Sequence, residues 1–457
     1  MRAFYCVAII GLAQVLLATA CASPIMVDQA ADSATPTTIL APTILSIAAP
    51  TPTPADAAAS AASQVPVPPP SAPSQVPMAP TSAPSQVPVP PPSAPSPPPT
   101  PTPVDTTPVV IQGDGWVTTE ADVARLATFV EETHQLEYTE PVTVLVSDDV
   151  GAEYAPSFEA FESGEWWLLQ ALGFAQSQVD RDVTNQVRRD RIRGLCCRFN
   201  DGTQVVVEVE ATKLETEAIV VHELTHALHT QYPDLFENTR YDTDETPKPF
   251  AASIEGVPQF VMFAYLDRSS AEELAAVAPE LPIIGPDMVP LIGPGPALHL
   301  NFAYATGPAF VKAVVDARGI EGLTDLLASP PTTTEQILFP DKYLAGETAV
   351  DVPAPAAAPG DTVVASGTIG AAMLMFVLVN EHGESAALEL VESWAGDRYV
   401  VYEVDENVCM LATIALDTAE AQLVFGAKLI DSFRPALPDV TVTILDAGIE
   451  LRTCGDA

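Results

Sequence analysis

The sequence predicts an α+β fold, in which a small mixed sheet is followed by a mainly helical domain and a disordered Pro-rich tether precedes both. Three observations predict this order. Short runs rich in β-branched residues lie before residue 210, and most later segments repeat apolar residues with helical spacing. The dense proline content before residue 113 separates the tether from the folded part.

The first 21 residues have the pattern of an export signal. Arg2 precedes an apolar run that is too short for a transmembrane span. The segment 17–21 (LATAC) resembles a lipobox, which would make Cys21 the lipidated first residue. Residues 18–20 also fit ordinary cleavage with free secretion, and an uncleaved anchor is the remaining alternative. We therefore expect an extracytoplasmic protein that contacts a membrane only through a lipid at Cys21.

Residues 22–112 form the predicted linker. They are mainly Pro, Ala, Ser, Thr and Val, and one unit recurs at 63–73, 74–84 and 85–95. Such a segment buries too little apolar surface to offset the entropy lost on ordering, and its prolines favour polyproline II. We expect a stalk or passive spacer that carries the folded part, residues 113–457.

The chain carries 60 acidic and 19 basic residues, a net charge of −41. Nucleic acid is not an expected partner, because phosphate binding requires a basic surface. Docking on an anionic membrane is not expected for the same reason. The run Arg188–Arg193 (RRDRIR) stands out in so acidic a chain. It fits either a solvated helix face paired with nearby acids or a substrate site.

The elements of the folded part follow from local patterns. Helices are expected over 121–136, 166–174 and 187–193, and strands over 141–147 and 204–209. After residue 250, helices are expected over 260–266, 308–317, 369–379, 386–393 and 418–429, and a late strand over 440–445.

Four cysteines belong to the folded part: Cys196, Cys197, Cys409 and Cys454. An even number in an exported chain favours disulfides, for which three pairings are possible. Adjacent Cys196 and Cys197 would form a strained ring if bonded to each other. Among the possible pairs, Cys409–Cys454 is the one we expect.

The segment 212–229 predicts a well-bounded helix. Thr212 and Glu215 form a capping box at its start, apolar residues follow, and Pro233 ends it. The sequence His-Glu-Leu-Thr-His over 222–226 therefore lies on a helix, where its spacing has a chemical meaning.

His222 and His226 lie on one helix face, one turn apart, so both imidazoles can bind the same ion. Zinc takes neutral imidazole nitrogens in a tetrahedral shell. Glu223 lies farther round the helix, so its carboxylate lies beside the expected zinc ion and does not bind it. It can take a proton from a water molecule that zinc activates and pass it to a leaving amine.

A catalytic zinc site needs a third protein ligand. His229 shares the helix face, but three ligands on one straight helix cannot surround an ion, so a supporting or surface position is expected for it. Glu255 is the better third ligand, because a loop and a returning helix can separate it from His226. The competing carboxylates lie in the polar segment between them: Asp234, Glu237, Asp242, Asp244 and Glu245.

The segments 222–229 (HELTHALH) and 254–261 (IEGVPQFV) resemble the gluzincin class of zinc peptidases. The chain is also similar to bacterial HExxH proteins with a later Tyr-x-x-Gly-x-x-Phe segment, here 304–310, and a Gly-Asp-Arg-Tyr segment, here 396–399. The resemblance covers roughly 120–430 and implies a zincin-like catalytic domain with Zn²⁺. The site residues it implies are the ligands His222, His226 and Glu255 and the base Glu223.

Two positions depart from the gluzincin pattern. Pro258 must kink the helix that carries Glu255 or start a new one. Gln259 occupies a place where many gluzincins carry an aspartate that supports a histidine ligand. The metzincin alternative fails, because it needs Gly at 229 and His at 232, where this chain has His229 and Tyr232.

Peptidases of this type also need a group that stabilises the developing oxyanion. Tyr304 and Arg398 could polarise the scissile carbonyl or hold a substrate carboxylate. Alternatively both are structural, with Tyr304 packed beside Gly307 and Arg398 paired with Asp397. The remaining histidines His134, His299 and His382 are expected at the surface or in the core.

The leading hypothesis is an extracytoplasmic zinc-dependent peptidase that acts on proteins or peptides. One alternative is a non-peptidase zinc hydrolase that cleaves cell-wall amides. Another is a tethered binding protein with a structural or vestigial zinc site. Glu223 argues against the last, because a structural zinc site does not need a base.

Overall fold

The computed structural model describes residues 120–154, 163–175, 178–196, 203–208, 210, 212–236, 245, 247–277, 292–404, 407–446 and 448–456. The predicted signal peptide with Cys21, the linker and the start of the predicted folded part lie outside the described residues. The architecture is mixed α+β, as predicted, with helices and two small sheets in the described part.

Three short strands form the small mixed sheet that the sequence predicts ahead of the motif. β1 (Thr143–Val146) pairs in parallel with β3 (Gln204–Val207), and β2 (Gly194–Cys196) pairs antiparallel with the other edge of β3. The valines of the central strand β3 are buried. The sequence did not predict β2, which is too short to show alternation.

Helix α6 (Lys213–Thr230) carries the motif and packs against α2 (Glu120–His134), β2 and β3. Its N-terminus is capped as predicted, because the Thr212 side chain accepts a hydrogen bond from the backbone N–H of Glu215 at 3.1 Å. Most of its side chains are buried, polar ones included. The helix is therefore held on several sides, which fixes the direction of the motif side chains.

Helices α7 (Pro247–Leu266) and α10 (Pro294–Arg318) cross at two glycines. A Cβ on Gly256 would lie 2.8 Å from the carbonyl carbon of Gly307, and a Cβ on Gly307 would lie 2.9 Å from the Cα of Gly256. Only glycine permits this approach of two backbones. The crossing brings the turn of α7 that carries Glu255 beside the turn of α10 that carries Tyr304.

The structure decides between the two outcomes expected at Pro258. A new helix does not begin there, because α7 runs through Pro258, as α10 runs through Pro308. Each proline removes one backbone hydrogen bond. α7 packs against both α6 and α10.

α7 also joins two apolar cores. Ala252 and Val257 belong to the core shared with α10 and the C-terminal part of the chain. Val261 and Leu266 belong to the core shared with α2, α6 and the small sheet. Glu255 therefore lies on an element that both cores hold in place.

The other helices have the bounds α3 Val150–Tyr154, α4 Ser163–Ala171, α5 Gln178–Arg189, α8 Ala271–Val277, α11 Gly322–Ala328, α12 Thr334–Leu338, α13 Pro340–Ala345, α14 Ala371–His382, α15 Glu384–Val391 and α16 Ala419–Phe433, with a 3₁₀ turn η1 at Pro233–Phe236. The helices expected over 369–379, 386–393 and 418–429 correspond to α14, α15 and α16.

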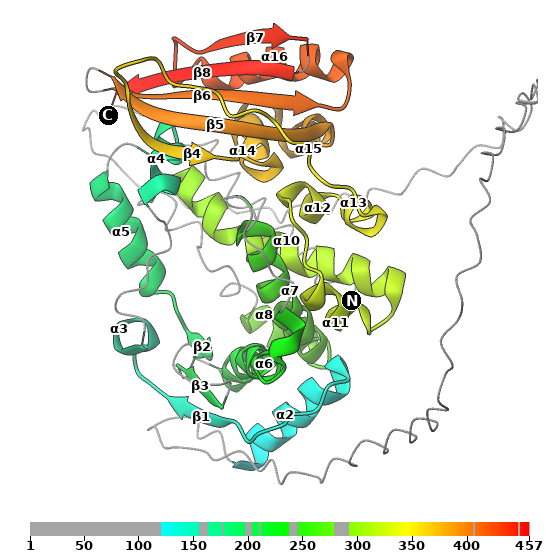
Figure 1. The fold of residues 1–457 in the computed structure, drawn as a ribbon. Helices are drawn as coiled ribbons and strands as arrows, with labels where there is room; N and C mark the ends of the chain where they lie inside the picture. The colour runs from blue at the N-terminus through cyan, green and yellow to red at the C-terminus, as the bar shows by residue number, and fades with distance from the viewer. Residues whose placement is uncertain are drawn as a thin grey trace, which may run out of the picture. The chain divides into compact units, whose positions relative to one another are not determined.

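The expectation of one late strand in a mainly helical region is wrong, because five antiparallel strands form a second sheet (Figure 1). Their order is β4-β5-β6-β8-β7, and their bounds are β4 Thr362–Gly367, β5 Trp394–Val404, β6 Asn407–Leu416, β7 Thr441–Leu445 and β8 Gly448–Asp456. Only β7 was predicted. Central strands with long apolar runs do not alternate strictly, so periodicity alone does not separate them from buried helices.

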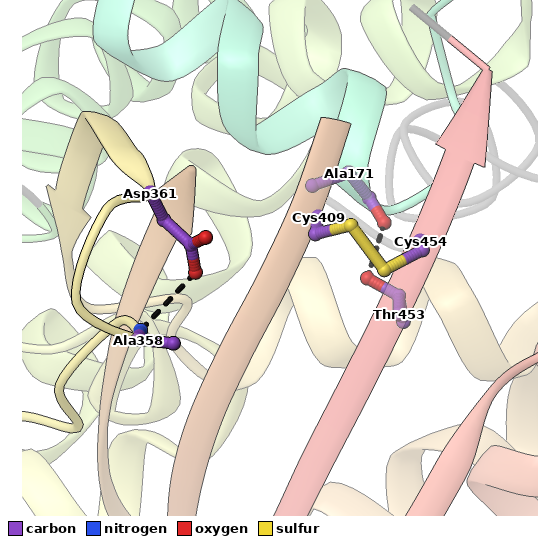
Figure 2. The surroundings of a disulfide bond; sticks show 6 residues. All are labelled: Ala171, Ala358, Asp361, Cys409, Thr453 and Cys454. Atoms are coloured by element: carbon purple, nitrogen blue, oxygen red, sulfur yellow. Dashed lines mark hydrogen bonds between the residues drawn. A yellow bond between two sulfur atoms is a disulfide. The ribbon is translucent and has the colours of Figure 1, made fainter. Parts of the chain in front are cut away.

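Cys409 on β6 and Cys454 on β8 face each other in register and form a disulfide (Figure 2). This is the pairing preferred among the three that the sequence allows. The adjacent Thr453 hydroxyl donates a hydrogen bond to the carbonyl of Ala171 at 2.8 Å, which ties β8 to α4. Cys196 is also disulfide-bonded.

Among the helices of the described part, none combines the length and the apolar character that a bilayer span requires.

Candidate metal centre

Three predicted ligands come together between α6 and α7. The Nε2 atoms of His222 and His226 lie 3.1 Å apart, and the Oε2 atom of Glu255 lies 3.2 Å from the first and 3.4 Å from the second. Ligand atoms in a tetrahedral shell with bonds of about 2.0–2.1 Å lie about 3.3 Å apart. The separations fit such a shell, so this group could hold a metal ion.

The electrostatics of the group also suit a cation. Burial acts to raise the pKa of Glu255, but the charges and hydrogen bonds of His226 and His222 outweigh burial and hold that pKa well below its usual range. Burial acts to lower the pKa of His226, and Glu255 reverses this effect. A carboxylate that stays ionised beside two imidazoles is compatible with a bound metal ion.

Contacts around α6 support the histidines. The Thr225 hydroxyl donates to the carbonyl of Val221 at 2.8 Å, and the Tyr138 hydroxyl donates to the carbonyl of Leu224 at 2.8 Å. Both hydroxyl groups therefore donate hydrogen bonds to backbone carbonyls of α6. These bonds hold the part of the helix that carries the two histidine ligands.

Glu223 is buried beside the three ligands but does not belong to the metal group. Burial is the main cause that raises its pKa, with a further contribution from Glu255, whereas His222 and His226 act to lower it. Its carboxylate accepts the backbone N–H of Cys196 on β2. A Cβ on Gly194 would lie 2.6 Å from the Glu223 Oε1 atom, so a glycine on β2 makes the space that this side chain occupies.

Tyr304 lies near the ligand His222. Its ring stacks near His222 with centroids 6.5 Å apart, and its hydroxyl lies 3.5 Å from an Nη2 atom of Arg188 on α5. Burial, followed by the charge of Glu255, raises the pKa of Tyr304 well above its usual value. The phenol therefore stays protonated at neutral pH and is able to donate a hydrogen bond, including one to Glu255.

A cavity of about 170 Å³ opens next to Glu255 and Tyr304. Its polar wall includes Arg188, Lys248 and His299, and its apolar wall includes Phe302, Met373 and Phe376. Sequence reasoning did not select the three polar residues as site residues. The basic run 188–193 was the available signal, but it did not distinguish Arg188 from its neighbours.

Glu165 on α4 organises this polar wall. Its Oε1 atom lies 3.1 Å from Lys248 Nζ and 3.3 Å from His299 Nε2. Burial lowers the pKa of His299 to about 4, although Glu165 opposes this shift. His299, expected at the surface or in the core, is thus a neutral and largely buried neighbour of the candidate site.

Arg398 does not line this cavity. It donates to the Thr368 hydroxyl at 3.2 Å. Asp397, its expected partner, instead accepts the backbone N–H groups of Ile369 and Gly370 at 2.7 and 3.0 Å. Asp397 also accepts the Trp394 indole N–H at 2.9 Å, so this acid anchors the start of α14.

The rejected ligand candidates lie elsewhere wherever the structure describes them. Glu245 is buried and accepts the backbone N–H of Thr334 at 2.7 Å, and Asp234 is exposed on η1. Glu237, Asp242 and Asp244 lie outside the described residues. Gln259 is buried, and its Oε1 atom has no hydrogen-bond partner among the described residues, so no described contact shows it supporting a histidine.

His229 is buried and pairs with His134 on α2, with 2.9 Å between their Nε2 atoms. Of the two positions expected for it, the surface one is excluded, and the contact with His134 links α6 to α2. His382 contacts the carbonyl of Lys428 at 3.2 Å.

The buried His134 predicts an acid-sensitive fold. Burial lowers its pKa to about 4, below an unfolded value of about 6.5, so its contribution to stability is complete above pH 6.5 and is lost as pH falls toward 4. Between pH 7 and pH 5.5 the wild type should lose about 1 kcal/mol of unfolding free energy relative to His134→Gln. Denaturant unfolding at both pH values measures this difference. An unchanged difference would mean that His134 does not resist protonation.

The structure brings together His222, His226, Glu255, Glu223 and Tyr304, and it places Arg398 in another contact. Comparisons of the chain with protein-family models, with curated proteins and with solved structures found no match.

Proposed function

We propose that this chain is an extracytoplasmic zinc-dependent peptidase of the gluzincin type, which hydrolyses peptide bonds in proteins or peptides. One observation carries the proposal: two histidines one helical turn apart and a glutamate from a second helix converge within 3.4 Å, beside a buried glutamate that does not join them.

The donor set favours zinc over other divalent cations. Two imidazole nitrogens and one carboxylate form the ligand set of known catalytic zinc sites, whereas calcium and magnesium take mainly oxygen ligands. Zinc held by His222, His226 and Glu255 would supply a Lewis acid that activates a water molecule and polarises the substrate carbonyl.

Glu223 supplies the proton transfers. Its carboxylate takes a proton from the attacking water as the new C–O bond forms, and it later delivers that proton to the amine nitrogen as the C–N bond breaks. The products are a carboxylic acid and an amine, and Glu223 returns to its starting state. Burial raises the pKa of the Glu223 carboxyl, which makes it a stronger base than an exposed glutamate.

Tyr304 is the proposed donor to the oxyanion. Its phenol stays protonated and lies beside the ligand His222. A hydrogen bond to the oxygen that gains charge in the transition state would stabilise that state more than the ground state. Arg398 is not proposed for substrate binding, because its described contact is with Thr368 on another element.

The location outside the cytoplasm rests on the signal-like residues 1–21 and the candidate lipidation site Cys21. The disulfide Cys409–Cys454 supports an oxidising compartment.

The deciding experiment measures metal content and hydrolysis on the full chain. We expect about one zinc per chain, cleavage of an unfolded protein substrate, loss of cleavage with a chelator and recovery with added zinc. A peptidoglycan digest is the parallel substrate. Cleavage of the digest alone would favour a cell-wall amide hydrolase, and zinc without any turnover would favour a structural site.

A further inference from the structure

The cavity that Glu255 helps to line also has two basic side chains, Arg188 and Lys248, and several apolar ones in its wall. We propose that it is a subsite for a substrate carboxylate, supplied by an acidic side chain or by a free C-terminus near the cleaved bond. This inference rests on the proposed peptidase function and names the class of substrate.

The concentration of positive charge at the cavity carries the argument. Only 19 of 457 residues are Lys or Arg. Two of them, Arg188 and Lys248, line this cavity, whose other ionisable residues include the neutral His299 and the carboxylate of Glu255. Arg188 lies on α5 and Lys248 on α7. The tertiary structure, and not one basic run in the sequence, therefore brings them to the same cavity.

The basic wall is organised before any ligand arrives. Glu165 contacts both Lys248 and His299 at 3.1 and 3.3 Å, and the Lys248 side chain is only 14% exposed. The Arg188 guanidinium reaches the Tyr304 hydroxyl, the proposed oxyanion donor. A guanidinium can bind a carboxylate through two parallel hydrogen bonds, and a fixed donor loses little entropy on binding.

The apolar residues of the cavity affect which groups fit and how tightly a carboxylate binds. Phe302, Met373 and Phe376 form an apolar part of the cavity wall, and charge-assisted hydrogen bonds are stronger in surroundings of low dielectric constant. The volume of about 170 Å³ is similar to that of cavities that hold a benzene-sized group. One side chain or one C-terminal residue therefore fits, with its apolar stem against Phe302 and its carboxylate toward Arg188.

The net charge of −41 opposes an acidic ligand only at long range. At physiological salt, charges farther away than about 8 Å are largely screened. Affinity therefore depends on the groups that line the cavity, and long-range repulsion acts mainly on the association rate.

The experiment measures binding and not turnover. The full chain carrying Glu223→Gln is titrated by calorimetry, zinc-loaded and metal-free, with peptides that differ by one group: Glu against Gln at each position, and free against amidated C-terminus. We expect at least one carboxylate peptide to bind roughly tenfold more tightly than its amide. The Glu and Gln peptides test whether an acidic side chain supplies the carboxylate. The free and amidated peptides test whether a C-terminus supplies it.

Variants of Arg188 connect this preference to the cavity. Arg188→Gln should remove the roughly tenfold preference. Arg188→Lys should retain part of it, because the positive charge remains but the two parallel hydrogen bonds of a guanidinium are lost. Arg189→Gln is the matched control, since Arg189 lies on the same helix and contacts the exposed Gln186. It should leave the preference unchanged.

The outcomes separate this inference from the proposed function. Equal affinity for carboxylate and amide peptides, or a preference that survives Arg188→Gln, overturns the carboxylate subsite even if the wild type cleaves peptides. Absence of zinc and turnover would reject the peptidase, and an Arg188-dependent preference in the metal-free chain would still support the subsite.

Discussion

Substitution of Glu223 by Gln is expected to lower kcat/KM for peptide hydrolysis about 1000-fold, which corresponds to roughly 4 kcal/mol of transition-state stabilisation. Gln has nearly the same shape, and it can keep the contact with the backbone N–H of Cys196. It cannot take up and return a proton, so the chemical step slows while the ligands stay in place. Steady-state kinetics and metal content on the same preparation measure both effects.

The matched control is Glu215→Gln, the same change about two turns earlier on α6. It should retain most activity, because Glu215 lies at the start of the helix. The proposed role of Glu223 would be wrong if Glu223→Gln kept more than about a tenth of the wild-type rate. Loss of zinc together with activity would instead indicate a structural contribution of Glu223.

Replacement of Gly307 by Ala is expected to lower the unfolding free energy by about 3 kcal/mol. In an ordinary helix the same change would stabilise by up to about 1 kcal/mol. Here the new methyl group would lie 2.9 Å from the Cα of Gly256 and would also collide with the carbonyl of Ala252. The sign of the effect therefore tests whether the crossing of α7 and α10 is as tight as described.

The same change should weaken zinc binding by at least about tenfold, because it pushes Glu255 away from the histidines on α6. Denaturant unfolding and zinc titration measure the two effects. Gly164→Ala is the control, since its methyl group would meet only the Ala365 Cβ at 3.9 Å. A Gly307→Ala variant as stable as the wild type, with unchanged zinc affinity, would contradict this account of the crossing.

Local patterns were sufficient for the helices and for part of the site. The capping box at Thr212 and the repeat of apolar residues located α6, and the spacing of His222 and His226 placed both on one face. These features depend on neighbours within a few turns, which a sequence shows directly.

The second sheet shows where local patterns fail. β6 and β8 are held together by pairing between residues such as Cys409 and Cys454, 45 positions apart. The apolar run of β6 is buried on both faces in places, so the alternation that identifies a strand is weakened there. For β6, the pairing partners stabilise a strand that its own sequence does not distinguish from a buried helix.

By itself, the sequence determined the motif helix, its two histidines, the glutamate between them, the preference for Glu255 as third ligand and the small mixed sheet. The tertiary structure alone decided that Glu255 lies within 3.4 Å of both rings, that Tyr304 stands beside them, and that Arg188 and not Arg398 reaches the cavity. Those placements depend on how α5, α7 and α10 pack against α6. Such packing is set by contacts between segments that lie far apart in the sequence. The periodicity of one helix does not show which other helix it packs against.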